Sequence, residues 1–217
     1  MNAIILLGAP GSGKGTQARL LAQRLGIPHV STGDMLRERL RQGVGVGTAV
    51  AGAMLAGALA PDGVVNRLVE ERLSEPDAGG GFVLDGYPRT GAQAESLREW
   101  LRVRGVGEVV IHLVIDYNIV IARLTSRRQC PRCGRVYNLI SQPPRRDAVC
   151  DSDGENLVTR EDDAEPVIRE RLEAYGRQTS PVLAWYRDAG ARVVDVEAGD
   201  GSPEEVFARV CQAMGVG

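Results

Sequence analysis

A glycine-rich segment near the start of the chain has the residue types and spacing of a phosphate-binding loop. Residues 8–16 read GAPGSGKGT, which contains the pattern G-x-x-x-x-G-K between an apolar segment and a segment with helical periodicity. Glycines allow backbone N–H groups to turn toward phosphate oxygens, and the N-terminus of the following helix adds partial positive charge. Gly15 stands where Ser or Thr usually follows the lysine, and the hydroxyl comes one residue later at Thr16. The sequence therefore predicts a phosphate site without predicting direct Mg²⁺ ligation by that hydroxyl.

The lysine of this loop, Lys14, is the only lysine in the chain, and the other 25 basic residues are arginines. An ammonium group is a compact charge on a flexible stem, whereas a guanidinium group is a wide planar fork that a tight phosphate nest would exclude. We therefore expect Lys14 to contact the terminal phosphates of a nucleotide.

A second polar segment follows a short apolar run at residues 82–84. Asp85 ends this predicted strand, and Arg89 lies in the loop beyond it. Ligands of open parallel sheets bind at the carboxyl ends of the strands, where a carboxylate beside a phosphate loop can orient Mg²⁺ or its waters. A guanidinium group there can hold a phosphate through two hydrogen bonds. We expect these two roles for Asp85 and Arg89.

Three of the four cysteines lie close together in the sequence and form part of a metal-ligand pattern. Cys130, Cys133, Cys150 and Asp153 have the spacing C-x2-C-x16-C-x2-D, which suits a structural zinc site with four protein ligands. The alternative fourth ligand is Asp151, although the x2 spacing favours Asp153. A redox C-x-x-C pair is the main alternative reading, but it would open a helix, whereas the residues that follow suggest a β-hairpin.

The elements that must position these residues alternate between strands and helices. Buried apolar runs predict strands, and apolar residues at helical spacing predict the helices between them. Strands are expected at 3–7, 29–30, 82–85, 109–115 and 192–196, and helices at 17–25, 35–42, 64–73, 93–103, 119–128, 165–186 and 203–214, with Thr32 and Asp34 capping the second helix and thinly packed helices within 43–61. The alternation breaks at 129–163, where cysteines, prolines, charges and short β-like pieces predict an insertion or lid.

Composition places this chain among ordinary globular proteins. It has 217 residues, of which 43% are hydrophobic and 25% charged, and a net charge of −2. These values exclude a disordered or collagen-like chain and argue against a surface that binds nucleic acid or an anionic membrane. No apolar run is long enough to span a bilayer, and the N-terminal residues lack the basic region of a signal peptide. We therefore expect a cytoplasmic protein.

Four sequence blocks together resemble the adenylate kinase family, in the order and spacing of that family over nearly the whole chain. They are GAPGSGKGT at 8–16, STGDMLR at 31–37, LDGYPRT at 84–90 followed by Gln93, and R-x-x-x-R-R at 123–128. The resemblance implies an ATP:AMP phosphotransferase, which transfers a phosphoryl group reversibly between ATP and AMP to give two ADP, with Mg²⁺.

The resemblance also implies an α/β fold of the P-loop type, with a five-stranded parallel sheet flanked by helices. Residues 1–217 would form a single domain with a core at 1–30, 61–126 and 164–217, a helical NMP-binding subdomain at 31–60 and a small β-rich zinc lid at 127–163. Bacterial lids of this long type often carry a zinc site, which supports a structural Zn²⁺ on the cysteine cluster.

The residues of each nucleotide site follow from the same resemblance. Gln93 would read the adenine edge of AMP through its amide, and Arg37 and Arg89 would clamp the AMP phosphate. The implied AMP-binding residues are Thr32, Arg37, Ala58, Leu59, Ala60, Gly86, Tyr87, Pro88, Arg89, Gln93, Arg160 and Arg171. The implied ATP-binding residues are Gly11, Ser12, Gly13, Lys14, Gly15, Thr16, Arg123, Arg127, Val136, Tyr137 and Gly201, with Val136 and Tyr137 under the base.

Catalysis would rest on positioning and charge, because an ionised AMP phosphate is already a nucleophile and needs no general base. Arg123 and Arg127 are four residues apart in the predicted helix, so both would face the transferred group. The implied catalytic residues are Lys14, Asp85, Arg89, Arg123, Arg127, Arg160 and Arg171. A closing lid would exclude water, the competing acceptor. Asp34, Asp162 and Asp163 could bind ligand or only organise arginines, and the sequence leaves both roles open.

Two other functions remain possible from the sequence. A kinase for UMP or CMP would share the phosphate loop, although Gln93, Thr32 and the long cysteine-bearing lid argue against it. A P-loop protein whose zinc ribbon binds nucleic acid would suit the basic residues around the cysteines, but Tyr137 is the one aromatic residue there that could stack on bases. We expect ATP, AMP and ADP as the small-molecule partners, no nucleic acid or membrane partner, and a monomer.

Overall fold

The computed structural model describes residues 2–43 and 48–216. Part of the predicted glycine- and alanine-rich stretch, at 44–47, lies outside the described residues. Among the helices that the structure describes, none combines the length and the apolar character needed to cross a bilayer.

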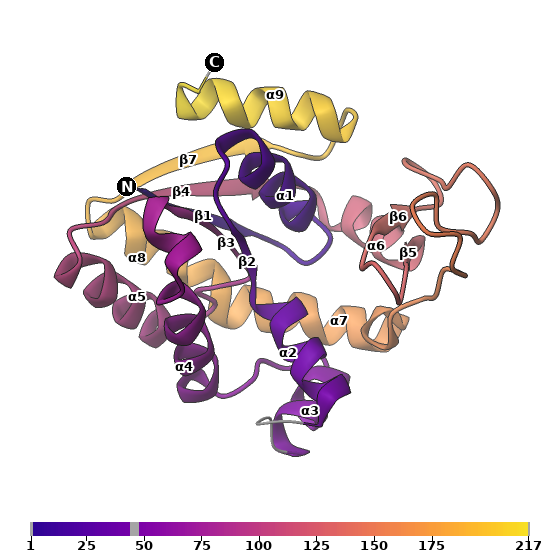
Figure 1. Ribbon diagram of the computed structural model, residues 1–217, viewed down its shortest axis with the longest axis horizontal. Coiled ribbons are helices and arrows are strands. Elements are labelled where there is room, and N and C mark those ends of the chain that lie inside the picture. The colour runs from indigo at the N-terminus through magenta and orange to yellow at the C-terminus, as the bar shows by residue number, and fades with distance from the viewer. Residues whose placement is uncertain (1, 44–47, 217) are drawn as a thin grey trace.

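A five-stranded parallel sheet forms the centre of the molecule (Figure 1). Its strands are β1 (Asn2–Gly8), β2 (His29–Ser31), β3 (Phe82–Asp85), β4 (Gly107–Val114) and β7 (Arg192–Glu197), in the order β2-β3-β1-β4-β7. Every neighbouring pair is parallel, with Leu6 and Ser31 both in register with Asp85. All carboxyl ends therefore point to one edge, and the predicted α/β class with a five-stranded parallel sheet is confirmed.

Helices cover both faces of the sheet. They are α1 (Lys14–Leu25), α2 (Thr32–Gln42), α3 (Thr48–Leu55), α4 (Asp62–Leu73), α5 (Gly91–Val103), α6 (Tyr117–Thr125), α7 (Glu165–Ala174), α8 (Ser180–Asp188) and α9 (Pro203–Met214). Buried residues of α1 and α9 pack on one face, and those of α4, α5 and α8 pack on the other (Figure 1). The strands are buried on both sides because alternate residues enter these two cores, as with Ile4 and Ile5.

The predicted lid region extends from the sheet as a small β structure. Strands β5 (Arg127–Gln129) and β6 (Val136–Asn138) pair antiparallel, and isolated bridges join Gln129 to Val158 and Val149 to Asn156. A short 3-10 helix, η2 (Glu161–Asp163), leads from this region into α7. Figure 1 shows the β5–β6 region projecting from the carboxyl edge of the sheet, on the side where α2 and α3 also project.

The prediction that a helix continues to residue 128 was wrong. Helix α6 ends at Thr125. The hydroxyls of Thr125 and Ser126 donate hydrogen bonds to the helix carbonyl oxygens of Ile121 and Ala122. Such side-chain bonds to the backbone favour a change of direction after the helix. Arg127 therefore begins strand β5 and does not share a helix face with Arg123.

Two further local expectations are also corrected. Ser31, rather than Thr32 or Asp34, is the N-cap of α2, because its side chain accepts a hydrogen bond from the backbone N–H of Asp34. The predicted continuous helix over 165–186 contains a π-helical turn at Tyr175–Thr179 between α7 and α8. Pro181 lacks the N–H that an α-helix would use at that point, which explains why the helical hydrogen bonding is interrupted there.

Candidate active site

One large cleft opens at the carboxyl edge of the sheet and has a volume of about 1420 Å³. The predicted site residues that line it are Gly11, Ser12, Gly13, Lys14, Gly15, Thr16, Arg37, Leu59, Asp85, Gly86, Pro88, Arg89, Arg123, Arg127, Val136, Tyr137, Arg160, Arg171 and Gly201. Predicted nucleotide contacts that do not line it are Thr32, Ala58, Ala60, Tyr87 and Gln93. Residues from the phosphate loop, α2, the β5–β6 region and α7 thus face a common space.

The phosphate loop connects β1 to α1 through backbone conformations that favour glycine. Gly11 has φ +79° and Gly13 has φ +96°, and a Cβ on Gly11 would lie 2.9 Å from Leu124. The side chain of Lys14 turns back over the loop, where its ammonium donates to the carbonyl oxygens of Gly8 at 2.6 Å and Ala9 at 2.7 Å. The backbone of the loop and the ammonium of Lys14 therefore lie close together at the N-terminus of α1.

Lys14 and Asp85 are both partly buried and lie close enough for each to act on the charge of the other. Burial lowers the pKa of Lys14 to about 7, opposed by Asp85 and reinforced by the positive charges of Arg89, Arg171 and Arg127. Burial raises the pKa of Asp85, but the neighbouring imidazole of His29 and the charges of Lys14 and Arg89 outweigh it and hold the pKa of this carboxyl below its ordinary value. Asp85 is thus a carboxylate at neutral pH, at the edge where the sequence placed it.

The loop after β3 directs Arg89 into the cleft. Its Nε donates to the carbonyl oxygen of Gly86 at 2.8 Å, and the hydroxyl of Thr32 donates to the same oxygen at 2.8 Å. Gly86 has φ +76°, and a Cβ there would lie 2.8 Å from the Arg89 guanidinium. Burial, together with the positive charges of Arg171 and Arg37, lowers the pKa of Arg89 to about 10. This close packing of cations suits an anion-binding site.

Gln93 lies behind this loop with both ends of its amide engaged. Its Oε1 accepts from the backbone N–H of Arg89 at 2.8 Å, and its Nε2 donates to Asp62 at 2.8 Å. The side chain is 2% exposed. Tyr87 is also buried, and its hydroxyl donates to Asn66 at 2.9 Å. The structure thus places Gln93 where it holds the Arg89 backbone, and its predicted contact with adenine stays a prediction.

One buried and one partly buried carboxylate hold the arginines at the base of the lid region. Arg127 donates through Nε to Asp163 at 2.7 Å and through a second nitrogen to the other carboxylate oxygen. Arg171 of α7 contacts Asp162 at 2.9 Å and Asp163 at 3.2 Å. The carboxylate of Asp163 is 0% exposed. In this structure, Asp162 and Asp163 organise arginines.

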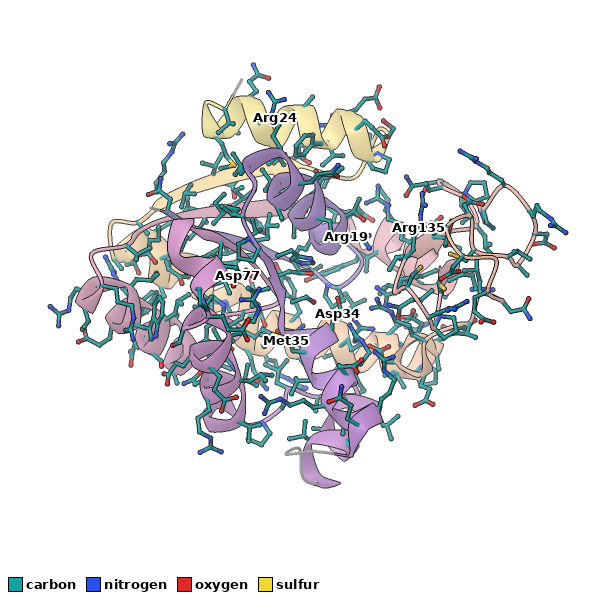
Figure 2. All side chains as sticks on the ribbon, viewed as in Figure 1. Arg19, Arg24, Asp34, Met35, Asp77 and Arg135 are labelled. Atoms are coloured by element: carbon teal, nitrogen blue, oxygen red, sulfur yellow. The ribbon has the colours of Figure 1, made fainter. Side chains whose placement is uncertain are left out.

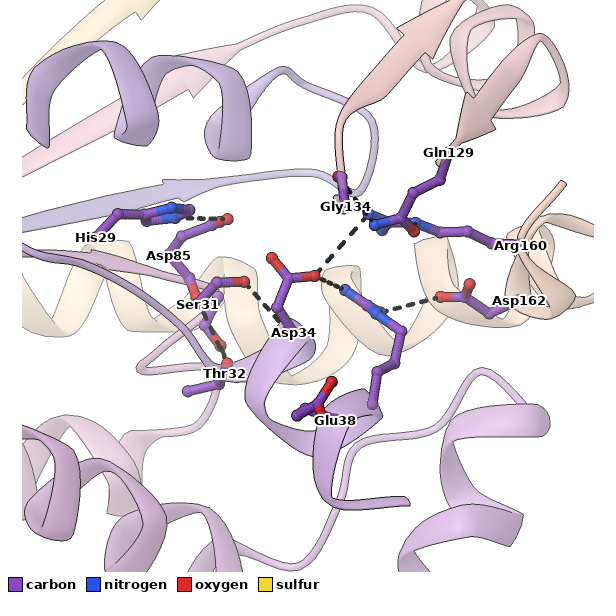
Figure 3. Close-up of polar contacts among 12 residues, drawn as sticks. His29, Ser31, Thr32, Asp34, Glu38, Asp85, Gln129, Gly134, Arg160 and Asp162 are labelled. Atoms are coloured by element: carbon purple, nitrogen blue, oxygen red, sulfur yellow. Dashed lines mark hydrogen bonds and ion pairs between the residues drawn. The ribbon is translucent and has the colours of Figure 1, made fainter. Parts of the chain in front are cut away.

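Asp34 lies between two arginines of different segments (Figure 3). Its carboxylate contacts Arg37 of the same helix at 2.7 Å and Arg160 of the lid region at 4.0 Å. Arg37 also lies 4.0 Å from Asp162. Burial and the neighbouring charges of Arg127 and Arg37 lower the pKa of Arg160 to about 9. Residues of α2 and the lid region therefore meet across the cleft through charged groups.

Arg123 reaches the opposite wall of the cleft from the end of α6. Its Nη2 donates to the carbonyl oxygen of Gly199 at 3.3 Å, in the loop after β7. Gly201 of that loop also lines the cleft and has φ +81°. Arg123 and Arg127 thus both line the cleft, although they do so from a helix and a strand rather than from one helix face.

The predicted metal ligands lie together in the lid region. One ligand atom from each of Cys130, Cys133, Cys150 and Asp153 lies within 4.8 Å of the others. The sulfur of Cys130 is 3.4 Å from both Asp153 oxygens, and the sulfurs of Cys133 and Cys150 are 3.6 Å apart. Tetrahedral Zn²⁺ with Zn–S bonds of about 2.3 Å requires sulfurs roughly 3.8 Å apart, so the group has the size of a zinc site. Figure 2 shows its sulfur atoms gathered in the lid near Arg135.

The backbone around this cluster is shaped to receive thiolate ligands. Backbone N–H groups of Cys133 and Ser152 point to the sulfurs of Cys130 and Cys150, each at 3.4 Å. Tyr137 is 3% exposed, and its hydroxyl lies 3.4 Å from the Cys150 sulfur. Asp151, the alternative ligand, instead accepts a hydrogen bond from the backbone N–H of Arg145.

Two residues of this site were not singled out from the sequence. His29 lies at the start of β2 with its Nε2 3.5 Å from the Asp85 carboxylate, because β2 and β3 are neighbours in the sheet (Figure 3). Gln129 contacts Arg160 from the end of β5. A signal for His29 existed, since a predicted strand beside the one ending in Asp85 would bring it near, but no pattern pointed to Gln129.

Comparison with known proteins gives a consistent result across the chain. Residues 6–191 match the family model described as Adenylate kinase. An adenylate kinase of Anaeromyxobacter dehalogenans strain 2CP-1 is 46% identical over 213 residues, which cover 98% of this chain and 99% of that protein. Those of Pseudothermotoga lettingae and Moorella thermoacetica are 50% and 43% identical, over 84% and 98% of this chain and 85% and 97% of their own lengths. The chain therefore belongs to the adenylate kinase family.

Proposed function

We propose that this enzyme binds ATP and AMP at opposite ends of the cleft and transfers the phosphoryl group between them at its arginine cluster. Membership of the family makes the chain an ATP:AMP phosphotransferase, which converts ATP and AMP reversibly into two ADP and uses ATP with Mg²⁺. The alternative kinase for UMP or CMP and the nucleic-acid-binding P-loop protein are not favoured, because the relatives that match nearly the full length are adenylate kinases.

The observation that carries the proposal is the excess of positive charge at the centre of the cleft. Arg37, Arg89, Arg127, Arg160 and Arg171 line the cleft together with Lys14. Asp34, Asp85, Asp162 and Asp163 are the carboxylates described above that pair with these cations or act on their charge. Because the cations outnumber the carboxylates and several are partly dehydrated, a polyanion would gain more from this site than from water.

The position of each group suggests which nucleotide it would hold. The phosphate loop at Gly11 to Thr16 would bind the ATP phosphates, since its N–H groups lie at the N-terminus of α1. Arg37 and Arg89 lie on the side of α2, where they would hold the AMP phosphate. Arg123, with Gly201 behind it, would lie on the ATP side together with Val136 and Tyr137. Thr32 and Gln93 would act on the AMP side by holding the loop that carries Arg89.

The chemistry requires positioning rather than proton transfer. The ionised phosphate of AMP attacks the terminal phosphorus of ATP, the bond from that phosphorus to ADP breaks, and the charge that develops on the transferred group is shared by nearby cations. Lys14, Arg127, Arg160 and Arg171 would supply that charge from fixed positions. Water would compete as the acceptor if the site stayed open, so closure of the lid region would favour AMP.

Asp85 suits the binding of the Mg²⁺ that accompanies ATP. It is a carboxylate at neutral pH, it lines the cleft beside Lys14, and oxygen ligands of this kind are those that Mg²⁺ prefers. Bound Mg²⁺ would neutralise phosphate charge. The role of Asp85 would be to orient the ion or its waters.

The cluster of three cysteines and Asp153 would hold a structural Zn²⁺. Four protein ligands leave no open position for catalysis. Because the ligands come from residues 130 to 153 of the lid region, the ion would hold these segments together in place of a hydrophobic core. We further propose a core at 1–30, 61–126 and 164–217, with residues 31–60 and 127–163 moving against it. The enzyme would act as a cytoplasmic monomer without nucleic acid or membrane partners, which suits its net charge of −2.

Replacement of Arg171 by alanine tests the proposed role of the arginine cluster. Removal of one transition-state cation typically costs on the order of a hundredfold in rate, so we expect a fall of about that size in kcat/KM for ADP formation. Arg169 offers a matched control because it lies on the same helix and pairs with Glu165 on the surface. Full activity of R171A, or an equal loss in R169A, would contradict the assignment.

A further inference from the structure

Gln129 occupies a place where three parts of the lid region meet. It ends β5, in register with Val136 of β6, and it lies immediately before the metal ligand Cys130. On its other side, its backbone N–H donates to the carbonyl oxygen of Val158 at 2.8 Å and its carbonyl accepts from the N–H of Val158 at 2.9 Å. Backbone pairing on both sides therefore fixes the position of its Cα.

The side-chain amide of Gln129 makes two hydrogen bonds in opposite directions (Figure 3). Its Oε1 accepts from Nε of Arg160 at 2.5 Å, and its Nε2 donates to the carbonyl oxygen of Gly134 at 3.1 Å. Because the amide is planar, the bond to Gly134 sets the direction in which Oε1 points. A change in the position of the Gly134 carbonyl would therefore change the direction of the oxygen that accepts from Arg160.

Gly134 belongs to the turn that presents the first two cysteines. Its N–H donates to the carbonyl oxygen of Cys130 at 3.0 Å, and it follows Cys133 directly. It has φ +74°, a conformation in which its carbonyl direction depends on the shape of this turn. A metal ion held by the two cysteine sulfurs would fix that shape, and with it the acceptor that holds the Gln129 amide.

Arg160 has few other partners that could hold it in place. Its guanidinium lies 4.0 Å from Asp34, on the far side of the cleft, and it is 12% exposed among like charges. Arg127 and Arg37 are near enough to act on its charge. Loss of the Gln129 oxygen would leave Arg160 attracted to Asp34 and Asp162 and repelled by the two arginines, so its orientation would change.

We propose that Gln129 is a positioning residue that couples the cysteine cluster to Arg160, so that a metal in the cluster sets the direction of this arginine in the cleft. The inference rests on the proposed function in taking Arg160 as a phosphate-binding group. In this proposal, a metal that touches no substrate affects catalysis, and it does so through the Gln129 side chain.

A double-mutant cycle in the metal-loaded enzyme tests the coupling. Q129L removes both side-chain hydrogen bonds while keeping a side chain of similar size. Q129E keeps an oxygen acceptor for Arg160. We expect Q129L to lower kcat about tenfold with a smaller change in KM, since a hydrogen bond to a charged group is worth about that factor or more. Because Q129E cannot donate to Gly134, we expect it to recover only part of the activity, and we expect Q129L to cause no further loss in an R160A background.

Ser152→Ala is the matched control. Its hydroxyl accepts from Arg135 at 2.7 Å, so this change removes a side-chain hydrogen bond between the two cysteine-bearing parts of the lid region, keeps the backbone N–H of residue 152, and does not reach the arginine cluster. Metal content and melting temperature are measured for every variant. S152A should keep the wild-type kcat. A loss of kcat in Q129L that S152A shares, or that adds fully to that of R160A, would overturn the coupling.

Hydrogen exchange at Nε of Arg160, followed by NMR, gives a readout that does not depend on turnover. In the loaded wild type this N–H should exchange at least about tenfold more slowly than in Q129L, and removal of the metal by a chelator should bring the wild type to the Q129L rate. Equal exchange in all three samples would overturn the proposal. If R160A itself keeps full activity, the proposed phosphate role of Arg160 fails, whereas an impaired R160A beside an unimpaired Q129L refutes the coupling alone.

Discussion

Lys14 shows how strongly the surroundings of one residue can change its chemistry. Its ammonium donates to two carbonyl oxygens of its own loop, yet burial and nearby arginines lower its pKa to about 7. Phosphates of bound ATP would add negative charge at this point and restore the charged form. Binding of ATP above neutral pH should therefore take up a proton at Lys14.

Because Lys14 is the only lysine, selective labelling of lysine with ¹³C gives a direct measurement. The side-chain signal should titrate near pH 7 in the free enzyme and stay charged beyond pH 9 with ATP. The affinity for ATP should fall as pH rises above 7, because a growing fraction of the free enzyme must first gain the proton. An ordinary pKa near 10 in the free enzyme would contradict this account.

Individual residue roles were only partly predictable from the sequence. The residue types at Lys14, Asp85 and Arg89 led to their selection because few side chains suit phosphate or Mg²⁺ at the end of a strand, and all three line the cleft. The surroundings of Gln93 were not predictable, since its contact with Asp62 depends on how α4 and α5 pack. The contact of Gln129 with Arg160 likewise depends on a bridge between residues 29 positions apart, Gln129 and Val158.

At the scale of elements, the join between the lid region and α7 depends on a buried carboxylate. Asp163 in η2 pairs with Arg127 of β5 and Arg171 of α7, and its carboxylate is 0% exposed. Removing one partner of a buried ion pair leaves the other charges without compensation, which typically lowers the free energy of unfolding by about 3–5 kcal/mol. These three residues therefore tie two elements together as well as line the cleft.

We predict that D163N lowers the free energy of unfolding by about 3 kcal/mol in denaturant titration. D195N is the control, because Asp195 pairs with Arg187 while 52% exposed and should cost less than about 1 kcal/mol. Equal losses of unfolding free energy in D163N and D195N would contradict the account, because they would show that burial of the Asp163 pair adds nothing to stability. Activity of D163N should fall as well, since Arg127 and Arg171 both lose their partner.

The lid region has little apolar core of its own, so its stability should depend on the cysteine cluster. Its buried cluster consists of Cys130, Tyr137 and Cys150, with Leu157 packed against them. Removal of bound metal by a chelator, or C150S, should abolish protection from hydrogen exchange within 127–163 while the central sheet keeps its protection. Unchanged protection in both cases would mean that the fold of this region does not need a metal.

Elements were predictable to the extent that local pattern decides them. Four of the five strands were expected because each contains a short apolar run, and parallel pairing followed from the alternation of strands with helices. The end of α6 was missed because Thr125 and Ser126 are compatible with a helix, and pairing of Arg127 with Asn138 in β6 decides the boundary. The π-helical turn was missed because Pro181 can also stand near the start of a helix.

For the molecule as a whole, the proposed function depends on one cleft that draws residues from distant segments. The phosphate loop comes from the start of the chain, Arg37 from α2, Arg89 from the loop after β3, and Arg160 and Arg171 from the lid region and α7. Contacts of Asp34 with Arg160 and of Arg37 with Asp162 join the two projecting parts across this cleft (Figure 3). Binding of two nucleotides there would replace carboxylates by phosphates as partners of the arginines.

Formation of ADP from ATP and Mg²⁺ with AMP, UMP, CMP, GMP or no acceptor tests the central claim most directly. The account predicts rapid turnover with AMP, rates at least about a hundredfold lower with the other nucleotides, and negligible hydrolysis without an acceptor. Turnover with UMP or CMP equal to that with AMP would contradict the assignment of the acceptor site. Hydrolysis of ATP without an acceptor at a comparable rate would contradict the role of the closing lid.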